Sequence, residues 1–271
     1  MTPSTPKPTY LAERRMEGKH LAYYLAAADA QFWDEHWKTY LSPTVYQAAE
    51  MGVLDPYEAV FTRYLPKTGK IIEAGCGLAQ YVLALHKRGY DIEGVDFSTE
   101  TVNAVRYLRP DIPIRVGDVC HLDVPENHYS GYISLGVMEH RHAGAEPFLE
   151  EAYRVIRPEG VALISVPQMH PLRKLKATLG LYRGDARGSE FYQYAYDVEK
   201  FSAILERHGF KVIHKMSSSG RKGIKDEIPF VQAHLQKQDW IGRVLEKWLS
   251  SSRFIEQHFG HMMLFVGQKS V

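Results

Sequence analysis

From Lys70 onward, short runs of aliphatic and aromatic residues alternate with segments of helical periodicity, and this alternation restricts the fold more than any other feature of the sequence. One helical segment repeats apolar residues every three to four positions between Leu78 and Leu85. Strands joined by helices form right-handed crossovers, which give a mostly parallel sheet covered on both faces. The strands that we expect are Ile71–Ile72, Asp91–Val95, Ile112–Val116, Tyr132–Val137, Val161–Val166, Phe210–His214 and His261–Val266.

The segments that flank this alternation divide the chain into three parts of one structural domain. Residues 1–65 are expected to be a loose tail and a helical cap, with helical stretches at Leu11–Tyr40 and Thr44–Tyr64, the second broken by Pro56. Residues 66–168 hold most of the strand and helix alternation, and residues 169–271 complete the sheet. Two intervals, at about 170–194 and 215–260, do not fit the rhythm, and we expect them to be lid insertions beside the carboxyl ends of the strands.

Composition excludes several classes of protein. The chain has 33 Lys and Arg against 32 Asp and Glu, a balance that argues against a nucleic-acid binder that relies on bulk positive charge. Cys76 and Cys120 are the two cysteines of the sequence, which favours a reducing cytoplasm over a disulfide framework. No apolar run reaches the roughly 20 residues of a membrane span, and Met1–Tyr10, with three prolines, does not resemble a signal peptide.

A glycine pair follows the first expected strand. Gly75-Cys76-Gly77 lies between that strand and the next helical segment, and glycines there permit a tight turn and close approach of a ligand to the backbone. The pair by itself also fits an ordinary strand-to-helix turn. The dinucleotide fingerprint needs a third glycine, and Gln80 occupies that position.

Acidic residues mark the ends of three successive strands. Glu73 precedes the glycine pair, Asp96 lies 19 residues beyond Gly77, and Asp118 follows Gly117. A carboxylate at the position of Asp96 suits both hydroxyls of a ribose. An acid beside the glycine loop repels a pyrophosphate but attracts an ammonium or sulfonium. The pattern therefore indicates a nucleoside ligand without phosphates, although a turn carboxylate is the ordinary role of a residue such as Asp118.

These segments, taken in order, resemble the motifs of class I S-adenosylmethionine-dependent methyltransferases. The resemblance covers about residues 70–168, and Phe191–Tyr196 is similar to a segment of bacterial members. The family usually has glycine at the position of Ala79 and a short connection between its last two strands, which here are 46 residues apart. The matching segments are Glu73–Gly77, Gly94–Ser98, Gly117–Val119, Ser134–His140, Arg154–Gly160 and Ile164–Pro167.

The resemblance implies a fold, a cofactor and a set of binding residues. The fold class is α/β: a Rossmann-like, doubly wound, mostly parallel seven-stranded sheet with its last strand antiparallel, plus an N-terminal helical cap and lid insertions. S-adenosyl-L-methionine is the implied cofactor, and S-adenosyl-L-homocysteine is its product. The implied cofactor-binding residues are Glu73, Gly75, Cys76, Gly77, Gln80, Asp96, Phe97, Asp118, Val119 and Leu135, to which we add Trp37 as an aromatic ring that faces the sulfonium.

His140 is the candidate for a general base, because it follows the fourth expected strand and an imidazole titrates near neutrality. The alternative is that Glu139-His140 only packs the loop. His142 is a weaker second candidate. We expect no metal, because the spacing of His140 and His142 lacks a nearby carboxylate or cysteine pair.

Three further groups of residues have both a functional and an ordinary interpretation. The N-terminal aromatics around Phe32, Trp33 and Trp37, with His36 among them, either close over the ligands or bury a helix. The basic residues of 170–194 and 221–225 either bind an anionic acceptor or are solvated lid charges. The helical stripe of 235–249 is a cap helix, a homodimer surface or a membrane-surface helix.

The sequence therefore predicts a cytoplasmic enzyme that moves the methyl group of S-adenosylmethionine to an O or N atom of a small-molecule acceptor by in-line displacement. We expect neither nucleic acid nor membrane as partner, and a homodimer is one option. The alternatives are an NAD-dependent oxidoreductase and a catalytically inactive methyltransferase-like binding module.

Overall fold

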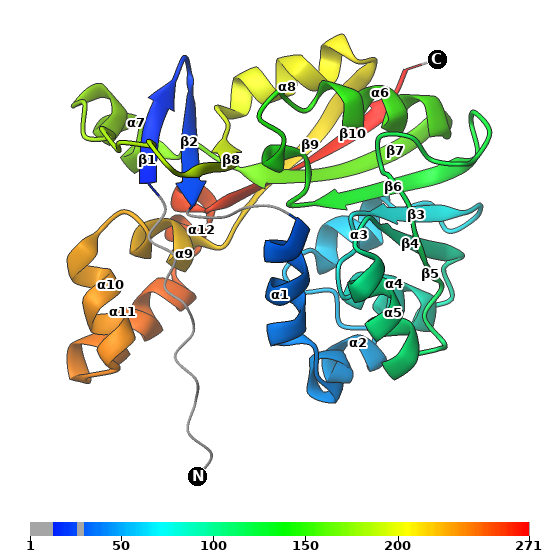
Figure 1. Ribbon diagram of the computed structural model, residues 1–271, viewed down its shortest axis with the longest axis horizontal. Coiled ribbons are helices and arrows are strands. Elements are labelled where there is room, and N and C mark those ends of the chain that lie inside the picture. The colour runs from blue at the N-terminus through cyan, green and yellow to red at the C-terminus, as the bar shows by residue number, and fades with distance from the viewer. Residues whose placement is uncertain (1–12, 26–29, 271) are drawn as a thin grey trace.

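The computed structural model describes residues 13–25 and 30–270, and its centre is a seven-stranded sheet of order β5-β4-β3-β6-β7-β10-β9 (Figure 1). β10 runs antiparallel to both of its neighbours, and the pairs from β5 to β7 are parallel. The expected Rossmann-like sheet and its antiparallel last strand are confirmed. The strands are β3 (Ile71–Ala74), β4 (Ile92–Asp96), β5 (Ile114–Val116), β6 (Tyr129–Leu135), β7 (Ile156–Pro167), β9 (Phe210–Ser218) and β10 (Met262–Lys269).

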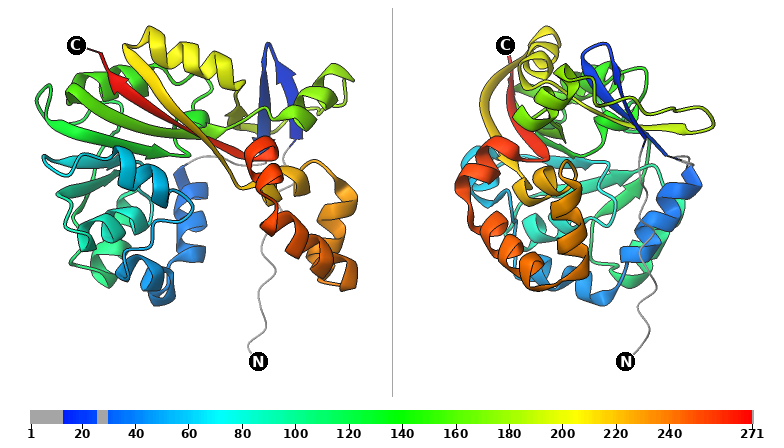
Figure 2. Two further views of the ribbon diagram at one scale, coloured as in Figure 1. Left: turned by 180° about the vertical axis from the view of Figure 1, so that it is seen from behind. Right: turned by 90° about the vertical axis from the view of Figure 1, so that its left-hand side faces the viewer.

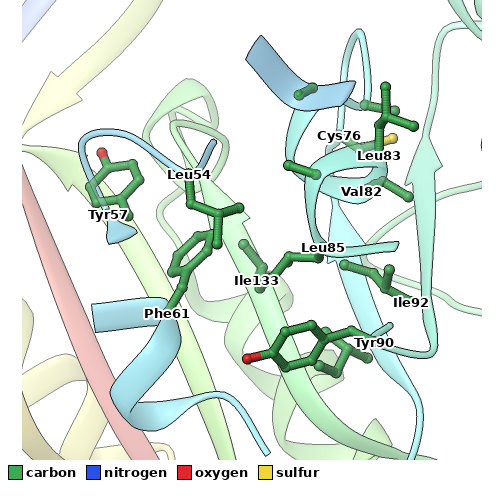
Figure 3. Packing of buried hydrophobic residues seen from close by; sticks show 14 of the residues in the cluster. Leu54, Tyr57, Phe61, Cys76, Val82, Leu83, Leu85, Tyr90, Ile92 and Ile133 are labelled. Carbon is green, nitrogen blue, oxygen red and sulfur yellow. The ribbon is translucent and has the colours of Figure 1, made fainter. Parts of the chain in front are cut away.

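Helices cover both faces of this sheet (Figures 1 and 2). On one face lie α3 (Glu58–Tyr64), α4 (Gln80–Lys87) and α5 (Thr99–Leu108), and on the other lie α6 (Glu146–Val155) and α8 (Val198–Arg207). Two separate groups of buried side chains fill the two interfaces, as expected for a sheet buried on both sides. Figure 3 shows part of the first group, in which side chains of α3 and α4 meet the sheet.

The helix expected over Leu11–Tyr40 is wrong in its first half. Residues 13–25 form a hairpin of β1 (Glu13–Glu17) and β2 (His20–Leu25), and β2 also pairs with β8 (Glu190–Ala195) to make a second, three-stranded sheet. Among the described residues of this stretch, the helix is α1 (Ala30–Tyr40). One partner of β2 is the adjacent β1, but the other, β8, lies more than 160 residues away, and local periodicity could not reveal that second pairing. The expected tail, Met1–Tyr10, lies outside the described residues.

The second N-terminal stretch follows the expectation more closely. A 3-10 turn at Pro43–Tyr46, α2 (Gln47–Glu50) and α3 occupy it, and the helical structure is interrupted around Pro56. The residue before a proline is disfavoured in helical conformation, which explains the break.

The two insertions lie beside the carboxyl ends of the strands. The first contains α7 (Pro171–Thr178) and β8, and the second contains α9 (Gly220–Lys225), α10 (Pro229–Lys237), α11 (Trp240–Ser251) and α12 (Arg253–Phe259). Figures 1 and 2 show α1 and the second insertion on the same side of the large sheet as α4 and α5. No helix in the described part of the chain is long and apolar enough to cross a membrane.

The helical stripe of α10 and α11 is split between two faces. Leu235 and Leu249 are buried within the insertion, whereas Trp240, Val244 and Trp248 are exposed. The buried side chains pack the helices of the second insertion against one another, and the cap helix stays a prediction. The homodimer surface stays a prediction for the exposed part.

Candidate functional site

A pocket of about 380 Å³ lies where β3, β4, β5 and β6 end at their carboxyl sides. Parallel sheets commonly bind ligands at this edge. The pocket contains seven of the residues expected from the sequence, four of them on the loops after the first three of these strands. Its lining residues are Trp33, Trp37, Gly75, Asp96, Phe97, Asp118, Val119, Cys120, Gly136, Val137, His140, Arg141 and Phe148.

The glycine loop depends on the absence of side chains at two positions. Gly75 and Gly77 have φ of +78° and +50°, a region that favours glycine. A Cβ on Gly75 would lie 2.4 Å from Val137, and a Cβ on Gly77 would lie 2.7 Å from the ring of Trp37. The loop therefore passes closely beneath the lining of the pocket, as the glycine pair predicts.

Asp96 is the buried anion of the pocket, with 4% of its surface exposed. Its carboxylate accepts hydrogen bonds from the backbone N–H groups of Gly77, at 2.8 Å, and Ser98, at 3.0 Å. Burial raises the pKa of Asp96, and these two donors partly oppose the shift. The Asp96 carboxylate thus couples the glycine loop to the end of β4 and presents a charged acceptor to the pocket.

Asp118 is exposed. Its carboxylate stabilises a turn, which is the ordinary role of an aspartate at such a position. Its carboxylate accepts from the Cys120 backbone N–H at 2.8 Å and lies 3.2 Å from His121. The Cys120 N–H is the main reason that the pKa of Asp118 is lowered. Asp118 nevertheless lines the pocket, together with Phe97 and Val119, which supply apolar surface.

Five expected binding residues do not line the pocket. Glu73 is buried behind the loop, and burial raises its pKa to about 8. The Cys76 side chain packs into the core near Val82 and Leu83 (Figure 3), and Gln80 donates to the Val45 carbonyl at 3.0 Å. Their roles, and those of Gly77 and Leu135, stay predictions.

His140 lies at the inner end of the pocket. Its Nδ1 is 2.7 Å from the carbonyl oxygen of Tyr192, so Nδ1 carries the proton and donates it to that carbonyl. Burial lowers the pKa of His140 to about 4. The imidazole is therefore neutral at pH 7, with Nε2 as the nitrogen that has a lone pair. Trp33 and Tyr192 contact the ring, with centroids at 4.7 and 4.9 Å.

α1 closes one side of the pocket. Trp33 and Trp37 are one turn apart and both line it. The Ser98 hydroxyl, at the N-cap of α5, donates to Asp34 and ties α1 to the core. For these two tryptophans the arrangement supports the interpretation that they close over a ligand. Phe32 and His36 instead line a second cavity next to the first.

Glu139, which the sequence paired with His140, is 2% exposed, and one of its carboxyl oxygens has no hydrogen-bond partner among the described residues. Burial raises the pKa of Glu139 to about 8. Above about pH 4.5 the unfolded state has released the proton of this carboxyl, whereas the native state still holds it. The contribution of this carboxyl to stability consequently declines as the pH rises from about 4.5 to about 8.

We expect Glu139→Gln to raise the melting temperature at pH 8.5 by roughly 3 °C or more, and to have little effect at about pH 4, because the amide stays neutral at both. Melting curves at both pH values measure the difference. Glu150→Gln on the exposed surface of α6 is the control and should show no pH-dependent difference. Equal curves for Glu139→Gln and the parent protein would show that the carboxyl ionises freely in the folded state.

The basic residues of the first insertion are not all solvated. This corrects the interpretation that they are solvated lid charges. Arg173 has no exposed surface and pairs with Glu227 at 3.0 Å, and Lys176 pairs with Glu227 at 2.8 Å. Arg187 is solvated and pairs with Asp185 in its own loop. A buried guanidinium needs a partner because its desolvation is costly, and that partner lies in the other insertion.

The resemblance implies that Leu135 and the residues after it line the floor of the site, and of these Gly136 and Val137 line the pocket. Sequence reasoning did not single out Cys120, Arg141 and Phe148, which also line it. In the described part of the chain, no group of three or more His, Cys, Asp or Glu side chains is placed to hold a metal ion.

A glycine cradle, a buried acid at the end of the second strand and an aromatic cap at the carboxyl edge of such a sheet are the features of a site for a nucleoside-bearing ligand. Residues 72–164 match the family model described as a methyltransferase domain. Residues 72–164 are thus similar to a methyltransferase domain, and the chain is similar to S-adenosylmethionine-dependent methyltransferases.

Individual relatives are distant. A protein of Mycolicibacterium smegmatis named "probable S-adenosylmethionine-dependent methyltransferase" is 28% identical over 158 residues, which span 58% of this chain and 58% of that protein. The fold is similar to that of an S-adenosylmethionine-dependent methyltransferase from Methanosarcina mazei, with a TM-score of 0.56, 14% identity and coverage of 80% and 100%. It is also similar to a Haemonchus contortus phosphoethanolamine N-methyltransferase solved with phosphomonomethylethanolamine and S-adenosylhomocysteine, with a TM-score of 0.55, 16% identity and coverage of 95% and 71%. At these identities the two structures show the fold alone.

Proposed function

We propose that this protein transfers the methyl group of S-adenosylmethionine to an O or N atom of a small-molecule acceptor by in-line displacement. The observation that carries the proposal is the Asp96 carboxylate, which is buried beside the glycine loop and lines a pocket with aromatic walls. A ribose supplies two hydroxyl donors for such a carboxylate. All lining residues of the pocket except Trp33 and Trp37 belong to the matched methyltransferase domain, at the edge where parallel sheets commonly bind ligands.

The residues present fit an adenosyl sulfonium. Asp96 would accept from the ribose hydroxyls, and the apolar surfaces of Phe97 and Val119 would contact the adenine. Trp33 and Trp37 offer ring faces to a cation, which aromatic rings attract electrostatically. A sulfonium gives up its methyl group readily because the sulfide is a good leaving group. The chain's main tasks are therefore to orient the acceptor and to exclude water.

His140 would position the acceptor and take up its proton. With its pKa lowered to about 4, the imidazole is in the base form throughout the neutral range, but it is a weak base. This favours acceptors that already have a nucleophilic lone pair, such as an amine or a readily ionised hydroxyl. Activity should therefore not fall through protonation of His140 until the pH approaches 4.

We expect His140→Ala to lower kcat by roughly 100-fold, within the usual range for loss of a general base, and to change S-adenosylhomocysteine affinity by less than about threefold. Initial rates with an acceptor from a screen, and calorimetric titration of the product, measure the two quantities. His142→Ala is the matched control, because His142 is outside the pocket and bonds to Glu17 at 3.1 Å. Equal losses of turnover and product binding would instead assign His140 a structural role.

A thermal-shift experiment tests the proposal against its alternatives. A ligand that binds only the folded form raises the melting temperature, so S-adenosylhomocysteine should stabilise the protein and NADH should not. Amines, phenols and carboxylic acids, added with S-adenosylmethionine, should then include a compound that gains a methyl group. Stabilisation by NADH alone would favour the oxidoreductase, and product binding without turnover on any compound would favour the inactive module.

A further inference from the structure

A second cavity, of about 280 Å³, lies beside the first. Phe32 and His36 of α1 and Tyr192 of β8 line the second cavity, whereas Trp33 of α1 lines the first. The Trp33 and Tyr192 rings stack with centroids 5.9 Å apart. One layer of side chains therefore separates the two cavities. The lining residues of the second cavity are Arg14, Tyr23, Leu25, Phe32, His36, Tyr192, Gln193, Lys222, Asp226, Gln232 and His261.

Both insertions and the N-terminal hairpin contribute to this cavity. β2 and β8 supply one wall, α1 another, and α9, α10 and the residue before β10 the rest. These are the parts of the chain that lie outside the matched methyltransferase domain of residues 72–164. The second cavity is thus built by segments outside the matched domain.

Positive charge exceeds negative charge around the cavity. The Glu227 carboxylate is buried and lies within 3.0 Å of cationic nitrogens of Arg14, Arg173 and Lys176. The Asp226 carboxylate pairs with Lys222. These ion pairs contain four cations and two carboxylates. The surplus cations stand in a partly desolvated place, where an anion is attracted more strongly than in bulk water.

The cations around the cavity also act on His261, whose imidazole adds a hydrogen-bond donor. Its Nδ1 lies 2.9 Å from a guanidinium nitrogen of Arg173, which can only donate, so the neutral imidazole carries its proton on Nε2. Burial and the cations Lys222 and Arg173 lower the pKa of His261 well below its ordinary value. Tyr23 also lines the cavity, and its hydroxyl has no hydrogen-bond partner among the described residues.

Lys222 is the more exposed of the two cations, Lys222 and Arg14, that line the cavity. Its side chain is 51% exposed and lines the cavity, whereas Arg173 has no exposed surface and is committed to Glu227, Gln168 and His261. An entering anion can share the Lys222 ammonium with Asp226, because an ammonium has three donors.

We propose that this cavity is the acceptor site and that it selects an acceptor with an anionic group, a carboxylate or a phosphate, which binds between Lys222 and the floor of Tyr23 and His261. The inference rests on the proposed function. The nucleophilic atom would then lie at the other end of the acceptor, and it would reach the methyl group near His140 between the Trp33 and Tyr192 rings, which must move apart for the transfer. The rings of Tyr23, Phe32 and Tyr192 suit an aromatic or otherwise apolar body between the two ends.

Three probes that differ at one group test this selection: 4-hydroxybenzoate, 4-hydroxyphenyl phosphate and the neutral 4-hydroxybenzamide. Each is titrated into the protein saturated with S-adenosylhomocysteine. We expect at least one anionic probe to bind roughly tenfold or more tightly than the amide, as a charge-assisted contact implies. The comparison between the two anions shows whether a carboxylate or a phosphate is preferred.

Lys222→Gln should reduce the affinity for the better anion about tenfold and leave binding of the amide unchanged. Arg221→Gln is the matched control: it removes a charge from the same helix, pairs with Glu246 and does not line the cavity. The inference is overturned if the amide binds as well as the anions, if none of the three probes binds, or if Lys222→Gln leaves anion binding intact.

The same samples separate the two proposals. A protein that does not bind S-adenosylhomocysteine contradicts the proposed function itself. A protein that binds it without preferring the anionic probes contradicts only the assignment of the second cavity. The comparison of probes on the parent protein stands even where the Lys222 variant does not fold.

Discussion

Gly77→Val is expected to abolish detectable binding of S-adenosylhomocysteine, a loss of at least roughly 100-fold in affinity. A Cβ at this position would lie 2.7 Å from the Trp37 ring, and φ is +50°. The valine must therefore push Trp37 away or move the loop. Displacing Trp37 removes one wall of the pocket, and moving the loop breaks the 2.8 Å hydrogen bond from the Gly77 N–H to Asp96. Calorimetric titration of the product into the purified variant measures the effect.

Gly89→Val provides the matched control for this experiment. Gly89 also has a left-handed backbone, with φ of +81°, but a Cβ there would meet no atom within 4 Å. Both variants carry the backbone strain, and Gly77→Val alone intrudes on the pocket. If both variants bind the product like the parent protein, Gly77 has no part in the site.

Asp96→Asn is expected to weaken S-adenosylhomocysteine binding by roughly 100-fold, because hydrogen bonds to a charged partner contribute about 1.5–3 kcal/mol each. The amide has nearly the same size, so the variant keeps the packing but removes the charge and one of the two oxygens that accept from the Gly77 and Ser98 N–H groups. Burial raises the pKa of Asp96, and the carboxylate must be ionised to accept both hydroxyls. Affinity of the parent protein should therefore fall as the pH is lowered through that raised value, and the variant should lack this dependence.

Asp91→Asn at the opposite end of β4 is the control and should bind like the parent protein, since Asp91 is exposed and precedes the strand. Titrations at several pH values provide both comparisons. Unchanged affinity of Asp96→Asn would mean that no ligand hydroxyl meets this carboxylate.

The first pocket could be predicted from the sequence because the motifs that form it are local. Gly75, Asp96 and Asp118 each follow a strand within a few residues, and parallel strands bring their carboxyl ends to one edge. The lining of the first pocket accordingly contains these three residues, with Trp37 and His140. Cys76 and Gln80 lie in the same motif but point elsewhere, because spacing does not determine where each side chain of a turn is directed.

The opposite side of the molecule depends on contacts between distant segments. The β1–β2 hairpin is stabilised by β8, and the Arg173 charge by Glu227, 54 residues away. A charge run normally indicates a solvated surface, and only the folded chain shows that Arg173 is buried. The second cavity arises from such contacts, so no local sequence pattern predicts it.

A crystal structure of the complex with S-adenosylhomocysteine tests the assignment most directly. We predict that the adenosyl group occupies the 380 Å³ pocket, with both ribose hydroxyls within hydrogen-bond distance of Asp96 and the sulfur facing Trp33, Trp37 and His140. A complex in which the nucleoside binds elsewhere, or in which Asp96 contacts no part of it, would contradict the function proposed for this protein.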